Sequence, residues 1–274
     1  MRHRGGMTAT DSRPREVARS RAPAIAAVVL GIAGTAALTW FAVMTLPGQE
    51  LDQRAMTTVT AGRDAQLWVL SVLGRVSIGA VLLVAIGCVV LALVRRQLPA
   101  AIAALVVIGG ANVTTQLLKH LIIDRPDLGL EVGVLNSLPS GHTTVVASSA
   151  AALALVAPRA LTPPVAAFAA FATALTGAST VVAGWHRPSD VLATLTVTVA
   201  WTGIAALLVR RDRRGVPPVG LLAWIASAGA LVVLIVVGVR PDGGWSGLAE
   251  TIAVLGVLGA AVALWATATV RLTR

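Results

Sequence analysis

Residues 99–118 read PAAIAALVVIGGANVTTQLL, and the polar stretch KHLIIDRP follows them at residues 119–126. The first run is apolar and about as long as the ~20 residues that a helix needs to cross a bilayer. Comparable runs recur along the chain, in which 56% of the 274 residues are hydrophobic and only 12% are charged. The sequence therefore predicts an all-α, polytopic membrane helix bundle rather than a soluble domain.

Eight apolar runs predict eight membrane spans, at residues 24–46, 76–94, 99–118, 142–158, 162–184, 190–209, 219–239 and 247–268. The polar motifs described below fall within the first six spans, so residues 22–210 are predicted to form a six-helix core. Residues 211–274 then form a C-terminal two-helix hairpin. We expect residues 1–21, which are polar and rich in arginine, to be a disordered cytoplasmic tail. A short interfacial helix is expected in the loop at 47–75, around the apolar residues 67–70.

The charged residues lie almost entirely between the predicted spans. With eight spans, the arginines of residues 2–21, 95–96, 159, 210–214 and 271–274 fall on one side of the membrane. The positive-inside rule makes that side the cytoplasm, so both termini are expected there and the chain is expected in the cell membrane. Most acidic residues and all the polar motifs fall on the extracytoplasmic side. The arginines flanking the spans explain the net charge of +10 through contacts with membrane lipids, so we expect no nucleic-acid partner.

The sequence HRPSD at residues 186–190 opens the sixth predicted span. Pro188 suits the first turn of a helix, and Asp190 is favoured there by the helix dipole. A carboxylate four residues after His186 can hold one ring nitrogen protonated, which leaves the other nitrogen to attack phosphorus. The alternative is a helix-capping aspartate beside a histidine at the membrane interface.

The sequence PSGH at residues 139–142 opens the fourth predicted span. Ser140 is a natural N-cap, and the amides around Gly141 would face an anion at the positive end of the helix. His142 could then donate a proton to a leaving oxygen. The alternative is a proline–glycine turn with a surface histidine.

The polar stretch after the third predicted span contains Lys119, the only lysine of the chain, and Arg125. Lysine offers a point charge to a phosphoryl oxygen, and arginine offers a two-pronged fork. The alternative is two cations that extend towards the membrane surface. His120 and Asp124 are expected to be surface residues. Because all three stretches fall on one face of the membrane, together they predict a metal-free phosphoryl-transfer site.

The order of these motifs resembles that of the type 2 phosphatidic acid phosphatase superfamily, which includes bacterial acid phosphatases and vanadium haloperoxidases. The resemblance covers about residues 70–210 and rests mainly on PSGH and the later His-x-x-x-Asp. It implies a six-helix core, with a covalent phosphohistidine on His186, orientation of that ring by Asp190, and His142 as the general acid. It also implies a set of phosphate-binding residues, namely Lys119, Arg125, Ser140 and Gly141. No metal and no cofactor are implied.

The resemblance implies a lipid phosphatase that acts at the outer membrane face. The substrate would be a polyprenyl phosphate or pyrophosphate, phosphatidic acid, or phosphatidylglycerol phosphate. Two alternatives use the same site: a phosphotransferase, and a non-catalytic protein that binds lipid phosphates.

The chain departs from the family pattern at two places. Five residues separate Lys119 from Arg125, where the family usually has six. The third motif usually begins Ser-Arg, whereas this chain has Ser179 and Thr180. A phosphate-binding arginine is therefore missing, and our hypothesis is that Arg187 supplies the charge from another direction.

Overall fold

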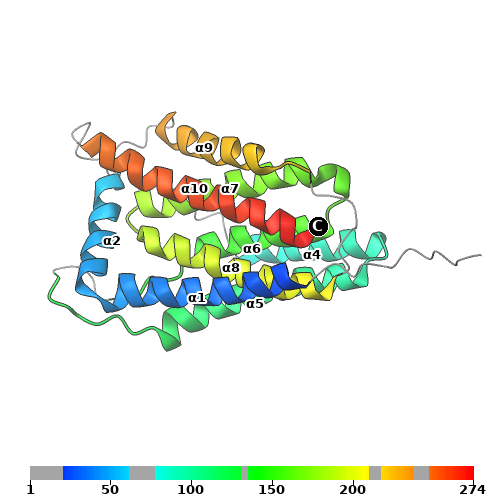
Figure 1. Cartoon of the computed structure of the whole chain (residues 1–274), viewed down its shortest axis with the longest axis horizontal. Coiled ribbons are helices and arrows are strands. Elements are labelled where there is room, and N and C mark those ends of the chain that lie inside the picture. The colour runs from blue at the N-terminus through cyan, green and yellow to red at the C-terminus, as the bar shows by residue number, and fades with distance from the viewer. Residues whose placement is uncertain (1–20, 62–77, 131–134, 210–216, 237–246) are drawn as a thin grey trace, which may run out of the picture.

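The computed structural model describes residues 21–61, 78–130, 135–209, 217–236 and 247–274 (Figure 1). Within these ranges the chain forms nine α-helices: α1 (Ala22–Met44), α2 (Leu46–Val59), α4 (Ile78–Val94), α5 (Leu98–Leu117), α6 (Gly141–Val156), α7 (Thr162–Val182), α8 (Pro188–Leu208), α9 (Gly220–Val236) and α10 (Leu248–Thr273). A π-helical turn, η1 (Leu118–Ile122), continues α5, and a 3₁₀ turn, η2 (Arg159–Leu161), leads into α7.

All eight predicted spans correspond to helices, which are α1 and α4 to α10. Five helical stretches are long and apolar enough to cross a membrane, at 22–44, 98–122, 159–182, 188–208 and 248–273. The remaining three, at 82–94, 141–156 and 220–236, are shorter apolar helices. The prediction of an all-helical, multi-pass membrane protein is confirmed. The predicted interfacial segment at 67–70 and the first twenty residues lie outside the described ranges.

Proline and serine mark where several of these helices begin. α1, α5, α7 and α8 each carry proline in the first turn, where its missing N–H costs no hydrogen bond. α6 begins instead after Ser140, whose side chain accepts a hydrogen bond from the backbone N–H of Thr143. The predicted N-cap role of Ser140 and the predicted place of Pro188 are confirmed.

Small residues let the helices approach closely inside the bundle. A methyl group added to Gly31 of α1 would come within 2.6 Å of the carbonyl oxygen of Thr196 on α8. Gly203 of α8 lies similarly close to the backbone of Ala24. In contrast, large apolar side chains such as Leu83 and Leu221 are exposed on the outer surface of the bundle. This arrangement is typical of a protein whose outer surface faces lipid and whose helices associate through close packing.

The last two helices pack onto the rest of the bundle. α9 and α10 lie beside α7 in Figure 1, and one buried cluster joins Ala223 of α9 and Val262 of α10 to Ala170 of α7 and Leu195 of α8. The two helices therefore share a core with the first six spans. The domain boundary at residues 210 and 211 remains a prediction, because residues 210–216 lie outside the described ranges.

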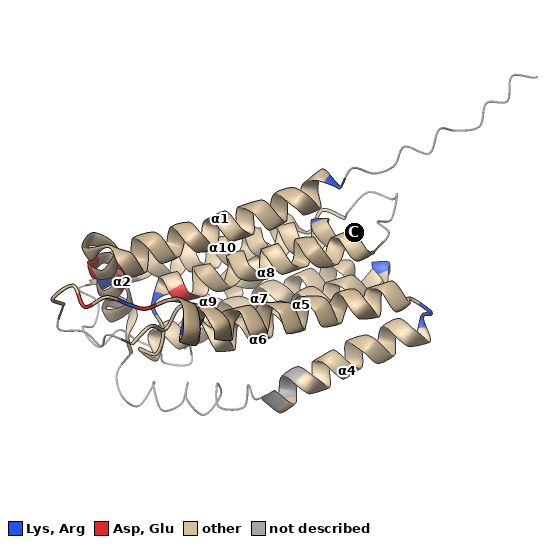
Figure 2. Cartoon of the chain, turned by 90° about the horizontal axis from the view of Figure 1, so that it is seen from below, with Lys and Arg blue, Asp and Glu red and all other residues tan. Residues whose placement is uncertain are grey.

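α2 lies across one end of the bundle, at a large angle to the spans (Figure 1). The described acidic residues gather at this end, whereas Figure 2 shows only basic residues at the opposite end. The acidic residues occur in α2, in the loop after η1, and at the starts of α8 and α10. The two ends thus differ in charge as the sequence predicted, and the assignment of the basic end to the cytoplasm remains a prediction.

Candidate active site

Hydrogen bonds tie the three polar stretches together at the α2 end of the bundle. The backbone N–H of Ser140 donates to the carbonyl of Asp190 at 3.1 Å. The hydroxyl of Thr194 lies 3.0 Å from the backbone carbonyl oxygens of both Ser140 and Asp190, and its proton is shared between them. The amide of Asn136 donates to the carbonyl of Lys119 at 3.3 Å. The segment before α6 therefore connects η1 to the start of α8.

A tight turn at the end of α7 positions His186. Gly184 adopts a φ of 71°, a left-handed conformation that glycine tolerates at a helix end. The backbone N–H groups of Trp185 and His186 both donate to the carbonyl of Thr180, at 3.1 and 3.2 Å. The chain thus reverses direction between α7 and α8 and places the imidazole of His186 against the first turn of α8.

The imidazole of His186 is paired with the carboxylate of Asp190. Nδ1 of His186 lies 2.9 Å from Oδ2 of Asp190, and both side chains are buried. The same carboxylate oxygen accepts a hydrogen bond from the backbone N–H of Arg187 at 2.9 Å. A carboxylate at Nδ1 favours the tautomer with its proton on that nitrogen, which gives Nε2 the lone pair. The pair is therefore suited to nucleophilic attack by Nε2.

Few of the described residues pack against Gly141 at the N-terminus of α6. Ser140 is fully buried, and its hydroxyl pairs with that of Thr143 at 2.9 Å. A methyl group added to Gly141 would meet only the amide nitrogen of Gln116, at 3.9 Å. The side of α6 at Gly141 is therefore open among the described residues, next to a helix N-terminus that favours an anion.

His142 lies among the other polar groups of the site. Its ring stands beside that of Trp185, with the ring centroids 5.6 Å apart. His186 and Lys119 are near enough for their charges to act on it. Lys119 itself is partly buried in η1. His142, half-buried and in the neighbourhood of His186, is therefore the candidate for the proton donor to the leaving group.

Two guanidinium groups converge on the site from different loops. Arg125 is buried, and its Nη2 has no hydrogen-bond partner among the described residues. Burial, followed by the nearby positive charge of Arg187, lowers the pKa of Arg125, whereas the carboxylates of Asp52 and Asp190 oppose this shift. A buried N–H without a partner, close to a second guanidinium, is an arrangement that an anion such as phosphate would satisfy.

Thr180, which stands where the family usually has arginine, is fully buried. Its hydroxyl donates to the carbonyl of Gly177 at 2.8 Å, within α7. Arg187 follows the proposed nucleophile and is held by two hydrogen bonds. Its Nε donates to Oε1 of Gln53 at 3.1 Å, and its Nη1 donates to the hydroxyl of Ser137 at 3.2 Å.

From the sequence alone, contacts of α2 with the loop after η1 and with the start of α8 are not expected. Asp52 accepts hydrogen bonds from the backbone N–H of Ser189, at 3.0 Å, and from its hydroxyl. Gln49 donates to the carbonyl of Pro126 at 3.1 Å. Burial raises the pKa of Asp52 to about 6, although the hydrogen bonds from Ser189 oppose this shift. One feature of the sequence could have pointed to these contacts of α2. The spacing of Gln49, Asp52 and Gln53 places three polar side chains on one face of a helix.

Two further observations bear on the predicted residues. His120 and Asp124 are exposed, as expected of surface residues. Among the residues that the structure describes, no three His, Cys, Asp or Glu side chains are grouped so that they could hold a metal ion.

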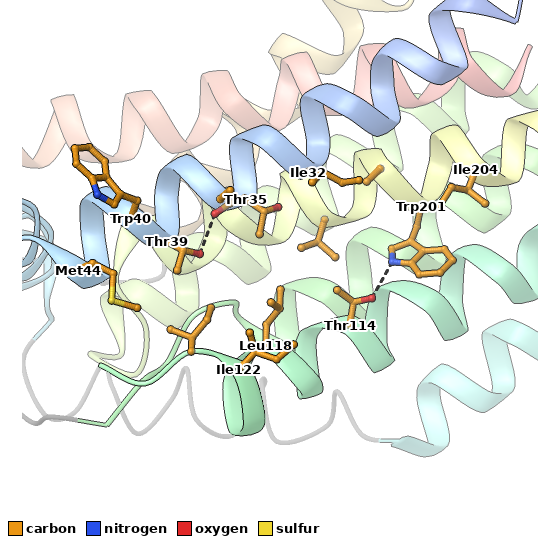
Figure 3. A pocket seen from close by; sticks show the side chains of 14 residues that line it. Ile32, Thr35, Thr39, Trp40, Met44, Thr114, Leu118, Ile122, Trp201 and Ile204 are labelled. Carbon is orange, nitrogen blue, oxygen red and sulfur yellow. Dashed lines mark hydrogen bonds between the residues drawn. The ribbon is translucent and has the colours of Figure 1, made fainter. Parts of the chain in front are cut away.

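An apolar cavity of about 590 Å³ lies between α1, α5, η1 and α8 (Figure 3). At one end are Met44 and Ile122, close to the loop that carries Arg125, and at the other end is Ile204. The indole N–H of Trp201 donates to the hydroxyl of Thr114 at 3.0 Å, so this polar group is satisfied within the wall. A second apolar cavity, of about 720 Å³, lies between α4, α6 and α7 and begins at Val145, one turn below His142.

The family model described as the PAP2 superfamily matches residues 100–214 of this chain. That range includes η1, the start of α6, the end of α7 and all of α8, which together carry the motifs. Searches of curated proteins and of solved structures find no match.

Proposed function

From the match of residues 100–214 to the family model of the PAP2 superfamily, we propose that the chain belongs to this family and that it is a membrane lipid phosphatase. Membership of this family supports a phosphatase-type reaction. The finer proposal is that the protein hydrolyses a lipid phosphomonoester or pyrophosphate at the extracytoplasmic face, without a metal ion and through a phosphohistidine.

In the proposed reaction, Nε2 of His186 attacks phosphorus while the bond to the leaving oxygen breaks. Asp190 keeps the proton on Nδ1 and stabilises the positive charge that develops on the ring. His142 donates a proton to the leaving oxygen, which departs as the lipid alcohol or, from a pyrophosphate, as the lipid monophosphate. Water then gives a proton to His142 and attacks phosphorus, which releases phosphate and restores His186.

Positive charge and backbone amides would stabilise the transferring phosphoryl group. Arg125 and Arg187 supply two guanidinium groups, Lys119 supplies an ammonium group, and the first turn of α6 supplies N–H groups at Gly141. Such groups act without rearrangement when they are already held in place. Here burial holds Arg125, and burial together with two hydrogen bonds holds Arg187.

A lipid substrate is supported by the apolar cavity beside the site. This cavity reaches the end of the bundle where α2 lies, at Ile122 and Ile123, within three residues of Arg125. The second cavity begins a helical turn below His142. We therefore assign the first cavity to the hydrocarbon chain of the substrate, with the phosphate held above it.

The single observation that carries this function is the convergence of the His186–Asp190 pair with Arg125 and the N-terminus of α6. The test is to measure phosphate release by the purified protein from a panel of lipid phosphates, without added metal. His186→Ala should abolish release while leaving the folded yield unchanged. Full activity of that variant would remove the proposed nucleophile.

The burial of Thr180, where the family usually has a phosphate-binding arginine, favours one alternative, a protein that binds lipid phosphates without turnover. Binding of a lipid phosphate by the wild-type protein with no release of phosphate from any member of the panel would support it. Transfer of phosphate to an added lipid alcohol or sugar would instead indicate a phosphotransferase.

A further inference from the structure

α2 precedes the segment that matches the family, yet its side chains bond to two of the three motif loops. Gln49 donates to the carbonyl of Pro126, next to Arg125. Asp52 accepts two hydrogen bonds from Ser189 in the first turn of α8. Gln53 accepts a hydrogen bond from Nε of Arg187 at 3.1 Å. One face of α2 therefore connects the loop after η1 to the loop that carries the proposed nucleophile.

Arg187 needs to be held, because its charge lies close to that of Arg125. Two like charges in a partly buried site repel each other, and a long side chain would turn towards solvent if nothing opposed this. Gln53 and Ser137 bind two of the five N–H groups of the guanidinium without neutralising its charge. An acidic residue in place of Gln53 would hold the arginine but would also compete with phosphate for it.

We propose that Gln53 is a positioning residue that holds Arg187 in the phosphate site, and that Asp52 anchors the helix that carries Gln53. In this chain Arg187 thereby takes the role of the arginine that Thr180 replaces. The inference rests on the proposed function for its account of Arg187. It adds to that function a part of the chain outside residues 100–214.

The test measures the dissociation constant of inorganic phosphate for the detergent-solubilised full-length protein. Gln53→Ala should weaken phosphate binding about tenfold, because a charged hydrogen-bond donor is no longer held towards the ligand. A matched control is Thr57→Ala, since Thr57 lies on the exposed side of α2 and bonds only within its own helix. This control should bind phosphate as the wild type does.

A double-mutant cycle separates positioning from a general loss of structure. If Gln53 acts through Arg187, then Gln53→Ala should have little further effect on phosphate binding in the Arg187→Ala background. Equal effects of Gln53→Ala with and without Arg187 would overturn the proposal. So would a Gln53→Ala protein that binds phosphate as tightly as the wild type.

The outcomes distinguish this inference from the proposed function. A wild type that releases phosphate from lipid phosphates, combined with an additive cycle, would overturn only the role of Gln53. A coupled cycle in a wild type that binds phosphate but hydrolyses no lipid phosphate would support Gln53 and contradict the phosphatase.

Discussion

Oδ2 of Asp190 accepts hydrogen bonds from both Nδ1 of His186 and the backbone N–H of Arg187, each at 2.9 Å. One carboxylate oxygen thus fixes the imidazole and the loop that carries it. The backbone of His186 is also fixed from the other side by the carbonyl of Thr180. The orientation of the ring is therefore determined by its neighbours before any substrate binds.

Asp190→Asn should lower kcat for lipid phosphate hydrolysis by roughly 10²–10⁴-fold, because the amide no longer stabilises the positive imidazole or fixes its tautomer. KM should change much less, since the phosphate-binding groups stay in place. Steady-state phosphate release checks this. A variant with wild-type kcat would show that the pair is only a helix cap.

Gly141→Ala should leave folding intact and impair phosphate binding. Among the described residues a methyl group there meets no atom closer than 3.9 Å, so it costs the fold little, but it takes up space beside the helix end where we propose that phosphate binds. The dissociation constant of inorganic phosphate should rise about tenfold. Gly109→Ala in α5, where an added methyl group also meets nothing within 4 Å, is the matched control. Equal phosphate binding by both variants would exclude this helix end from the site.

Thr180→Arg should reduce the yield of folded protein rather than raise turnover. The side chain of Thr180 is fully buried, and an unpaired guanidinium at that position would cost several kcal/mol. Thr180→Val is the control, because it loses only the hydrogen bond to Gly177, worth about 1 kcal/mol. Size-exclusion profiles and phosphate release measure the two effects. A folded Thr180→Arg protein with higher turnover would show that position 180 reaches the phosphate.

Asp52 should make the folded state less stable as the pH rises. Its pKa in the folded protein is about 6, above the ordinary value of 3.8, so the folded state holds this proton more tightly than the unfolded state does. The contribution of Asp52 to the free energy of unfolding is therefore fully present below pH 3.8 and is lost as the pH rises through 6, by roughly 3 kcal/mol.

The measurement is thermal unfolding in detergent between about pH 4 and pH 7. Asp52→Asn removes the titrating group, so the difference in stability between this variant and the wild type should change across that interval. Glu50→Gln removes a carboxylate on the exposed face of the same helix and should leave the pH dependence unchanged. Parallel curves for Asp52→Asn and the wild type would contradict the prediction.

Ala36→Phe should raise KM for a long-chain lipid phosphate roughly tenfold, because the new ring fills the cavity between α1 and α8. Turnover of a water-soluble phosphate ester should stay unchanged. Ala172→Phe places the same ring in the second cavity and should affect neither substrate. The reverse pattern would assign the hydrocarbon chain to the cavity below His142.

The spans and the helix starts could be predicted because lipid imposes simple rules. An apolar run of sufficient length becomes a helix, proline fits the first turn of a helix, as at Pro188, and serine fits the N-cap position, as at Ser140. Two predicted spans separate each cluster of arginines from the next, so all the arginine clusters fall on one side of the membrane. The three polar stretches then fall together on the other side. These arguments use local sequence and the sidedness of the membrane, and neither depends on how the helices pack laterally.

The contacts of α2 could not be predicted in this way. Asp52 and Gln53 share a helical face, but nothing in their spacing identifies Ser189 and Arg187, more than 130 positions further along the chain, as their partners. The role of Trp185 is likewise not predictable from the sequence, because an aromatic residue beside a motif is also typical of the membrane interface. Its contact with His142 depends on how the turn after α7 meets the start of α6.

The turn after α7 uses the main chain of Thr180 rather than its side chain to hold Trp185 and His186. Any residue that keeps the helix intact can offer the same carbonyl. The loop with the proposed nucleophile therefore does not depend on the chemistry of the side chain at position 180. What limits that side chain is the closed space around it, since Thr180 is fully buried.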